Sequence, residues 1–206
     1  MSGRGGVEGY DLGMASRSHF TRIATSGLSI LASAVLLLGT SACASRRDTP
    51  LKPLPREIDL KRFMGKWYVL AHIPVDNFFV SEADAYNAVE EYELAEDGSI
   101  PTTFTFREGS FDGPERVMQP TGFVHNERTN TEWRMQFFWP FKSDYLIVYL
   151  DDHYERTIIG VPDRSHAWIM ARTPSVPEED YAHLVAELVR LGHDPRKLRK
   201  VPQSAR

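Results

Sequence analysis

The 206-residue sequence has one cysteine, little excess charge and one extended hydrophobic run, and each scarcity excludes a class of protein. The single cysteine, Cys43, cannot form an intramolecular disulfide. The 24 Lys and Arg residues against 28 Asp and Glu residues give a formal net charge of −4, so the chain has no basic field that would attract nucleic acid. Beyond the N-terminal region, no stretch is long and apolar enough to cross a bilayer.

Sequence motifs of common catalytic centres are also missing. There is no Gly-x-Ser-x-Gly elbow, no His-Glu-x-x-His pair and no glycine-rich phosphate loop. His72, His125 and His166 do not have the spacing of metal ligands. Asp151-Asp152-His153 lies on a predicted hairpin tip, where adjacent side chains point in different directions. The sequence therefore supports no catalytic site, no metal site and no cofactor.

The first 42 residues have the features of an export signal. Arg17 and Arg22 form a basic region, and residues 27–39 are an apolar stretch shorter than a membrane span. Small residues then precede Cys43. Because the residues before Met14 suit neither a signal nor a fold, we predict that translation starts at Met14.

Cys43 is compatible with two kinds of processing. A lone cysteine at the end of an export signal is typical of a lipoprotein acylation site, although Thr40 stands where such motifs usually carry leucine. Conventional cleavage is the alternative, because Ala42-Cys43-Ala44 is an Ala-x-Ala pattern. We predict lipidation of Cys43, a polar tether over residues 43–56 and a folded domain over residues 57–206.

Short runs with β-strand composition, separated by turn residues, extend from Trp67 to Arg172 and predict an all-β fold. Asp97-Gly98 and Asp112-Gly113-Pro114 are examples of the breaks. Eight strands result, the number at which a closed barrel holds either its own side chains or one small ligand. We expect them near residues 66–73, 85–94, 100–107, 115–124, 131–138, 145–151, 155–160 and 167–172.

After Pro174 the apolar residues recur with a helical period. Pro177 and the acidic residues that follow it suit the N-terminal end of a helix, and Gly192 suits its C-terminal end. The apolar stripe favours packing against the outside of the barrel over lying on a membrane, because the first turn is acidic.

The run Gly65-Lys66-Trp67-Tyr68, at the entry to the first predicted strand, is the most informative motif. Gly65 permits a tight turn, and Trp67 can plug one end of a small barrel. Arg172, the last residue of the last predicted strand, would lie across the indole in a cation–π contact. Together with the Asp144-Tyr145 pair at a strand start, this order resembles the bacterial outer-membrane lipocalins over residues 58–201.

The resemblance implies an eight-stranded up-and-down antiparallel barrel with a C-terminal α-helix packed outside. It also implies a protein that binds, stores or transports fatty acids or lysophospholipids at the cell envelope, anchored through Cys43 to the periplasmic face of the outer membrane. Ala44, the residue after the cysteine, favours that membrane. The alternatives are a lipocalin-fold enzyme, such as an isomerase or de-epoxidase, and an envelope protein with a solid barrel. A homodimer is compatible with each of these.

Alternation within the predicted strands indicates which side chains would line a ligand cavity. If Arg172 crosses the barrel floor, its face of the strand is the inner one, and Trp168 and Met170 lie inside. Rigid aromatic rings and methionines make good walls for an acyl chain, although a single bulge would reverse the assignment. The predicted lining consists of Phe104, Phe106, Trp133, Met135, Phe137, Trp139, Tyr145, Tyr149, Trp168 and Met170.

Two apolar connections and several cations complete the predicted mouth. Phe78 and Phe79 lie in the long loop 74–86 and are either lid residues or a local cluster. Residues 138–141 (Phe-Trp-Pro-Phe) would contact the bilayer, the ligand or each other. The cations available for an anionic head group are Arg107, Arg116, Arg134 and Lys142.

Overall fold

The computed structural model describes residues 49–75 and 81–204. The export signal, Met14, Cys43, and the lid candidates Phe78 and Phe79 lie outside the described residues. The described residues belong to one compact unit. Within the described ranges, no helix has the length and hydropathy needed to cross a membrane.

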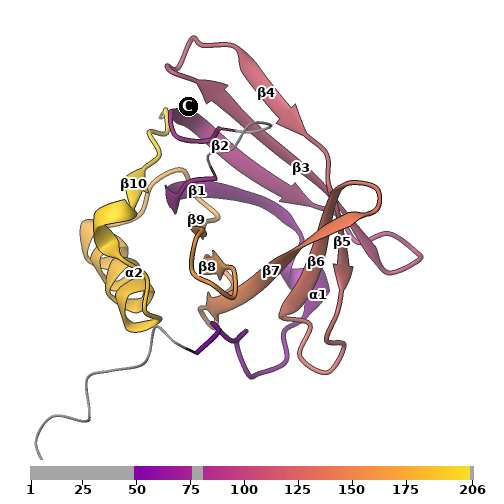
Figure 1. The fold of residues 1–206 in the computed structure, drawn as a ribbon. Coiled ribbons are helices and arrows are strands. Elements are labelled where there is room, and N and C mark those ends of the chain that lie inside the picture. The colour runs from indigo at the N-terminus through magenta and orange to yellow at the C-terminus, as the bar shows by residue number, and fades with distance from the viewer. Residues whose placement is uncertain (1–48, 76–80, 205–206) are drawn as a thin grey trace, which may run out of the picture. The chain divides into compact units, whose positions relative to one another are not determined.

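The domain is a closed antiparallel β-barrel in which each long strand pairs with the next and the last returns to the first (Figure 1). Closure is made by pairing of β1 with β9, where Tyr68 stands opposite Ala171. The strands are β1 (Gly65–Ile73), β2 (Ala85–Tyr92), β3 (Ser99–Glu108), β4 (Glu115–Met118), β5 (Thr121–Val124), β6 (Glu132–Phe138), β7 (Phe141–Leu150), β8 (Arg156–Gly160), β9 (Ala167–Ala171) and β10 (Arg199–Lys200).

The predicted eight-stranded barrel is confirmed, with one strand divided in two. β4 and β5 both pair with β3 and together occupy the place of the strand expected over residues 115–124. Gln119 and Pro120 separate them. Proline cannot donate to a ladder, and here the Pro120 carbonyl accepts a bond from the Thr102 amide (2.9 Å) instead.

The C-terminal helix α2 (Glu178–Arg190) packs against the outside of the barrel, as predicted. Leu184 and Leu188 are buried against outward-facing residues of β7, β8 and β9. Gly192 ends the helical segment with a φ of +93°, which a residue with a Cβ rarely adopts. Two shorter helices are α1 (Leu60–Phe63), capped by Asp59, and η1 (Pro195–Lys197), capped by Asp194.

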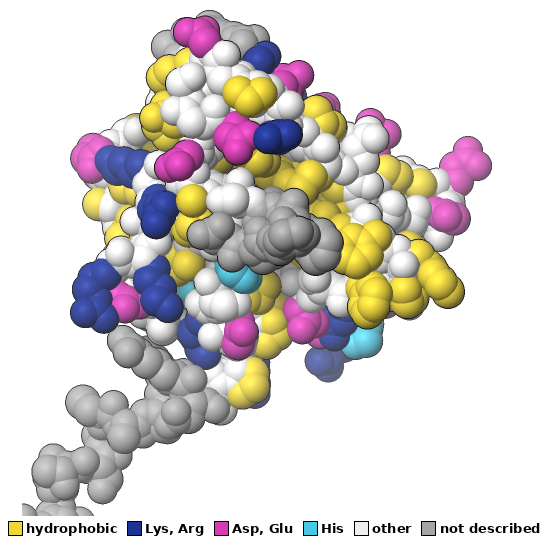
Figure 2. Space-filling view, turned by 45° about the horizontal axis from the view of Figure 1, so that its top comes forward, with side chains coloured by type: hydrophobic (Ala, Val, Ile, Leu, Met, Phe, Trp, Pro, Cys, Tyr) yellow, Lys and Arg dark blue, Asp and Glu magenta, His cyan; other side chains and the backbone are white. Residues whose placement is uncertain are grey.

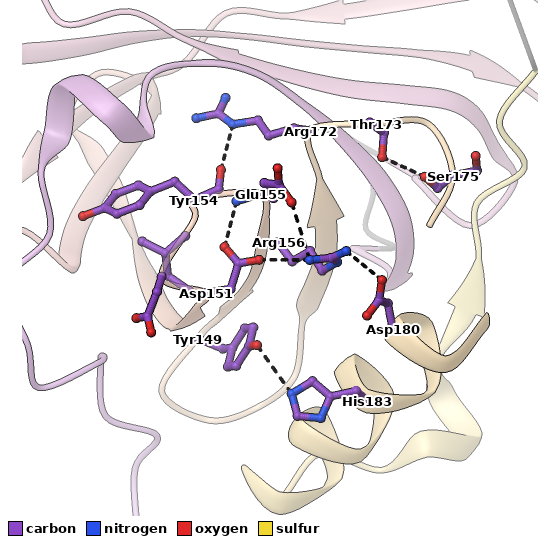
Figure 3. A network of polar contacts seen from close by, with 12 residues as sticks. Tyr149, Asp151, Tyr154, Glu155, Arg156, Arg172, Thr173, Ser175, Asp180 and His183 are labelled. Carbon is purple, nitrogen blue, oxygen red and sulfur yellow. Dashed lines mark hydrogen bonds and ion pairs between the residues drawn. The ribbon is translucent and has the colours of Figure 1, made fainter. Parts of the chain in front are cut away.

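A polar network fastens α2 to the barrel (Figure 3). Arg156 on β8 contacts Asp180 in the first turn of α2 (2.6 Å) and Asp151 at the end of β7 (3.3 Å). One turn further along α2, the His183 imidazole lies 3.5 Å from the Tyr149 hydroxyl. The helix is therefore held by side-chain contacts as well as by apolar burial.

The chain end completes the barrel wall in a way that the sequence pattern did not indicate. Pairing of β1 with β2 stops at Tyr68, and the short strand β10 pairs with β1 at Ala71 and His72. The side chain of Gln203 then donates to the carbonyls of both Val69 on β1 and Ala88 on β2 (2.8 and 3.0 Å). The C-terminal segment thus bridges the two strands where they diverge.

Candidate ligand-binding site in the barrel interior

One end of the barrel is closed by a tryptophan and an arginine. The Trp67 side chain is buried, and its Nε1 donates to the Phe63 carbonyl (2.9 Å). The guanidinium carbon of Arg172 lies 3.8 Å from the centre of the Trp67 ring. Arg172 also donates to the carbonyls of Lys66, Arg62 and Phe63 (2.9, 2.7 and 3.0 Å), which joins α1 to the start of β1. These contacts form the barrel floor.

The backbone conformation at the start of β1 requires a glycine at position 65. Its φ is +88°, in the left-handed region that favours glycine, and a Cβ there would lie 3.6 Å from Arg172 Nη1. Alanine would fit the space but not the backbone conformation, so the glycine allows β1 to start directly beneath the arginine.

Above the floor, aromatic rings pack against one another and fill the lower barrel. The Phe63 ring centre lies 5.0 Å from that of Trp67 and 5.5 Å from that of Trp133. Tyr92 meets Trp133 edge-on at 5.7 Å. Phe63, Trp67 and Trp133 have no accessible surface, so this part of the interior is solid.

The upper interior keeps some accessible surface. Trp168 retains 9% and Tyr145 and Phe104 each 6% of their surface, in contrast to the sealed rings below. Tyr145 stacks on Trp168 with ring centres 6.4 Å apart. The lower and upper parts of the interior form one hydrophobic cluster. Seven of the predicted lining residues belong to it: Phe104, Phe106, Trp133, Met135, Tyr145, Trp168 and Met170.

A carboxylate that sequence reasoning missed lies in the same interior. Glu90 on β2 accepts a hydrogen bond from the Tyr145 hydroxyl (3.1 Å) and a second from the Tyr92 hydroxyl, and the two hydroxyls also contact each other. Burial raises the pKa of Glu90 from 4.5 to about 7, against the opposing effect of the Tyr92 hydrogen bond, and the nearby charge of Glu82 raises it further. Glu90 therefore titrates near neutral pH.

A second buried acid, Glu82, stands close to Trp168 and His72. Trp168 Nε1 donates to Glu82 Oε2 (3.1 Å), and His72 Nδ1 lies 3.6 Å from the same oxygen. Both side chains are buried. Among the described residues, His72 Nδ1 has no hydrogen-bond partner.

One signal in the sequence does indicate a buried acid on β2. Glu90 and Glu91 are adjacent in a strand, and successive side chains of a strand point to opposite faces. In a closed barrel, one of the two must therefore face the interior. Glu90 shares the inner face with Ala88 and Tyr92, whereas Glu91 is exposed.

The four cations considered for an anionic head group all have partners outside the interior. Arg107 pairs with Glu115, Arg116 with Glu108 and Arg134 with Asp144 (3.4, 2.5 and 2.8 Å). Lys142 is exposed, with its Nζ 3.8 Å from the Phe123 ring centre. Within residues 49–75 and 81–204, no lysine or arginine is buried, although two glutamates are.

The arrangement of a plugged floor, an accessible aromatic interior and an external helix agrees with comparisons to known proteins. Residues 58–203 match the family model of the lipocalin-like domain. The chain belongs to the lipocalin family.

Relatives of this lipocalin occur in plants and bacteria. It is 30% identical to temperature-induced lipocalin-1 of Arabidopsis thaliana over 71% of this chain and 80% of the relative. It is 27% identical to outer membrane lipoprotein Blc of Escherichia coli K12 over 85% of this chain and 97% of the relative. Among solved structures, cockroach allergen Per a 4 superposes with a TM-score of 0.55 at 20% identity, covering 76% of this chain and 95% of that one, which shows a shared fold.

Three predicted lining residues of this lipocalin do not face the interior. A bulge in β7 between Ile147 and Tyr149 places Val148 and Tyr149 both on the outer face, where Tyr149 meets α2. The prediction for Tyr149 was wrong because the bulge reverses the alternation. Phe137 and Trp139 are 50% and 85% exposed. The pairing of β6 with β7 shifts its register after Met135, and the residues beyond that point form the tip of the β6–β7 hairpin.

That hairpin forms an exposed apolar surface, the β6–β7 tip. Its side chains belong to Phe137, Phe138, Trp139 and Phe141, each at least half exposed. The rings of Phe138 and Phe141 contact each other at 5.7 Å. Figure 2 shows hydrophobic side chains gathered on this face of the domain. Exposed aromatic clusters of this kind commonly mark an interaction surface.

Proposed function

We propose that this lipocalin binds a small hydrophobic ligand in its upper interior and serves to store or transport lipid at the cell envelope. The observation that carries the proposal is the contrast between the sealed rings at the floor and the accessible aromatic surface of Phe104, Tyr145 and Trp168 above it. An acyl chain entering this space would gain about 0.8 kcal/mol per buried CH₂ group. Fatty acids and lysophospholipids are the ligand classes that we propose.

We further propose that the protein is anchored to the outer membrane, on its periplasmic face, by acyl groups on Cys43. Similarity over most of the chain to proteins named outer membrane lipoprotein supports this location. The β6–β7 tip supports it independently, because Trp and Phe side chains are well suited to the region of the lipid head groups. An anchored barrel with an apolar tip would be able to exchange lipid with the membrane.

The names of the relatives reported above favour a binding role over catalysis, since neither name states an enzyme activity. One observation favours the alternative of a lipocalin-fold enzyme such as an isomerase. Glu90 titrates near neutral pH beside two tyrosine hydroxyls, which are suitable groups for acid–base catalysis. Recovery of a bound ligand with its structure changed after incubation would support that alternative.

Native mass spectrometry of the purified protein tests the binding proposal. We expect an adduct with the mass of a single-chain lipid, and displacement of it by added fatty acid or lysophospholipid. Met135→Arg introduces a longer, charged side chain into the interior and should abolish the adduct, because that side chain takes up apolar space that the acyl chain would fill. Gln136→Arg, the neighbouring outward position, is the matched control and should keep it. A wild-type protein that carries no lipid and binds neither class would refute the proposal and indicate a solid core.

A further inference from the structure

The two buried acids belong to one connected group of side chains. Glu90 is hydrogen-bonded to Tyr145, whose ring stacks on Trp168, and the Trp168 indole donates to Glu82. His72 Nδ1 approaches Glu82 from β1 without a hydrogen-bond partner among the described residues. The group therefore extends from Glu90, beside Tyr92, to Trp168 and Glu82 in the upper interior.

Both acids have an oxygen available to a ligand. The contacts of Glu90 with the two tyrosines and of Glu82 with Trp168 and His72 all reach Oε2. Within the described residues, no donor bonds to Oε1 of either glutamate. The two side chains retain 7% and 5% of their surface, although they lie inside the barrel. A ligand in the upper interior would thus meet acceptor oxygens.

The charge of this interior discriminates between ligand head groups. It contains two acids, and no lysine or arginine of the described residues is buried. A ligand carboxylate would be repelled by an ionised glutamate at low dielectric, whereas a protonated amine would form a charge-assisted hydrogen bond with it. The rings of Tyr145 and Trp168 add attraction for a cation through their faces.

We propose that the barrel interior selects amphiphiles whose polar end is a protonated amine over amphiphiles whose polar end is a carboxylate, with Glu90 and Glu82 as the specificity-determining residues. This inference rests on the proposed function, since it assumes that the upper interior admits a ligand. It keeps the binding of a single-chain amphiphile but disfavours fatty acids, whose polar end is a carboxylate, among the ligands proposed above.

The proposal carries a pH dependence with a definite sign. Glu90 is faced by Tyr92, Tyr145 and Glu82, and His72 lies against Glu82; the pKa of Glu90 is about 7. Between about pH 6 and about pH 8 it changes from mostly neutral to mostly ionised. Affinity for an amine should therefore rise over this interval, and affinity for a carboxylate should fall.

The experiment compares dodecylamine, dodecanol and dodecanoate, which share one chain and differ in head group. Each is titrated below its micelle concentration against the protein loaded with a neutral fluorescent probe, N-phenyl-1-naphthylamine. At about pH 8 the amine should bind at least about tenfold more tightly than the carboxylate, with the alcohol between them. Glu90→Gln should remove most of this preference and its pH dependence, and Glu82→Gln should reduce it. Glu91→Gln, on the outer face, is the matched control and should behave as wild type.

The possible results separate this inference from the proposed function. Equal or tighter binding of dodecanoate, or an amine preference that Glu90→Gln and Glu82→Gln leave unchanged, would overturn the selectivity while leaving lipid binding intact. Failure of the probe and of all three ligands to bind would instead overturn the proposed function. Circular dichroism of each variant establishes that it is folded before its affinity is compared.

Discussion

Glu90 should make the stability of the barrel depend on pH in a direction unusual for an acid. Its pKa in the folded protein is about 7, compared with an ordinary value of 4.5, because burial disfavours the charged form. The folded state therefore holds the proton over a range where the unfolded chain has lost it. The resulting stabilisation is fully present below pH 4.5 and is lost as pH rises through about 7.

The size of the effect follows from the two pKa values. One pKa unit corresponds to about 1.4 kcal/mol, so the interval from 4.5 to about 7 corresponds to about 3 kcal/mol of unfolding free energy. This is a large part of the total stability of a typical domain.

His193 has the opposite effect on the pH dependence of stability, so its contribution must be measured separately from that of Glu90. His193 is buried just after α2, beside Gly160 of β8, and burial followed by the charge of Arg164 lowers its pKa from 6.5 to about 4. The unfolded chain binds a proton there below pH 6.5, so stability rises with pH between about 4 and 6.5. In the wild-type protein the two effects largely cancel over that range.

The difference between wild type and Glu90→Gln isolates the glutamate. Urea unfolding followed by tryptophan fluorescence, from about pH 4.5 to about pH 8, should show the variant gaining about 3 kcal/mol relative to wild type as pH rises. The variant alone should show the rising profile of His193. Glu91→Gln, with an exposed side chain, should follow the wild-type profile. A difference between Glu90→Gln and wild type that is independent of pH would refute the reasoning.

Three further predictions concern the floor, the helix and the anchor. Trp67→Ala should lower the urea unfolding free energy by about 3–5 kcal/mol, because it removes a fully buried aromatic, and Arg172→Ala should lower it less; unchanged midpoints in both would contradict the floor assignment. Asp180→Ala, which leaves Arg156 without its partner on α2, should cost about 1 kcal/mol by the same assay, and an equal loss in Glu179→Ala would exclude a specific contact. Cys43→Ser should release the protein into the soluble periplasmic fraction; a wild type that is already soluble and labels with maleimide would show that no anchor exists.

Several features could be derived from the sequence because they depend on local patterns. Turn residues and period-two alternation separate the strands whatever their partners, and the change to a helical period after Pro174 marks α2. The contact between Trp67 and Arg172 at the floor could be predicted because both residues lie near strand ends, with Gly65 and Trp67 at the start of β1 and Arg172 directly after β9.

Other features depend on contacts between distant segments and were not predictable. The phase of β7 changes at Val148 because β8 pairs with it through a bulge, which moves Tyr149 to the outside. β10 has two residues, too few to show alternation, and its place is set by the gap that β1 and β2 leave.

By itself, the sequence predicted an eight-stranded β-barrel followed by an external helix, because hydrophobic periodicity and turn chemistry are local properties. The lipocalin family and the tryptophan at the barrel floor came from the resemblance of its motifs. Only the tertiary structure decided which side chains face the interior. Closing the barrel brings Glu90, Tyr145, Trp168 and Glu82 from separate segments into one buried group. That closure turns an interior expected to be apolar into an acidic one, since burial and charge depend on what lies across the barrel and not on neighbours along the chain.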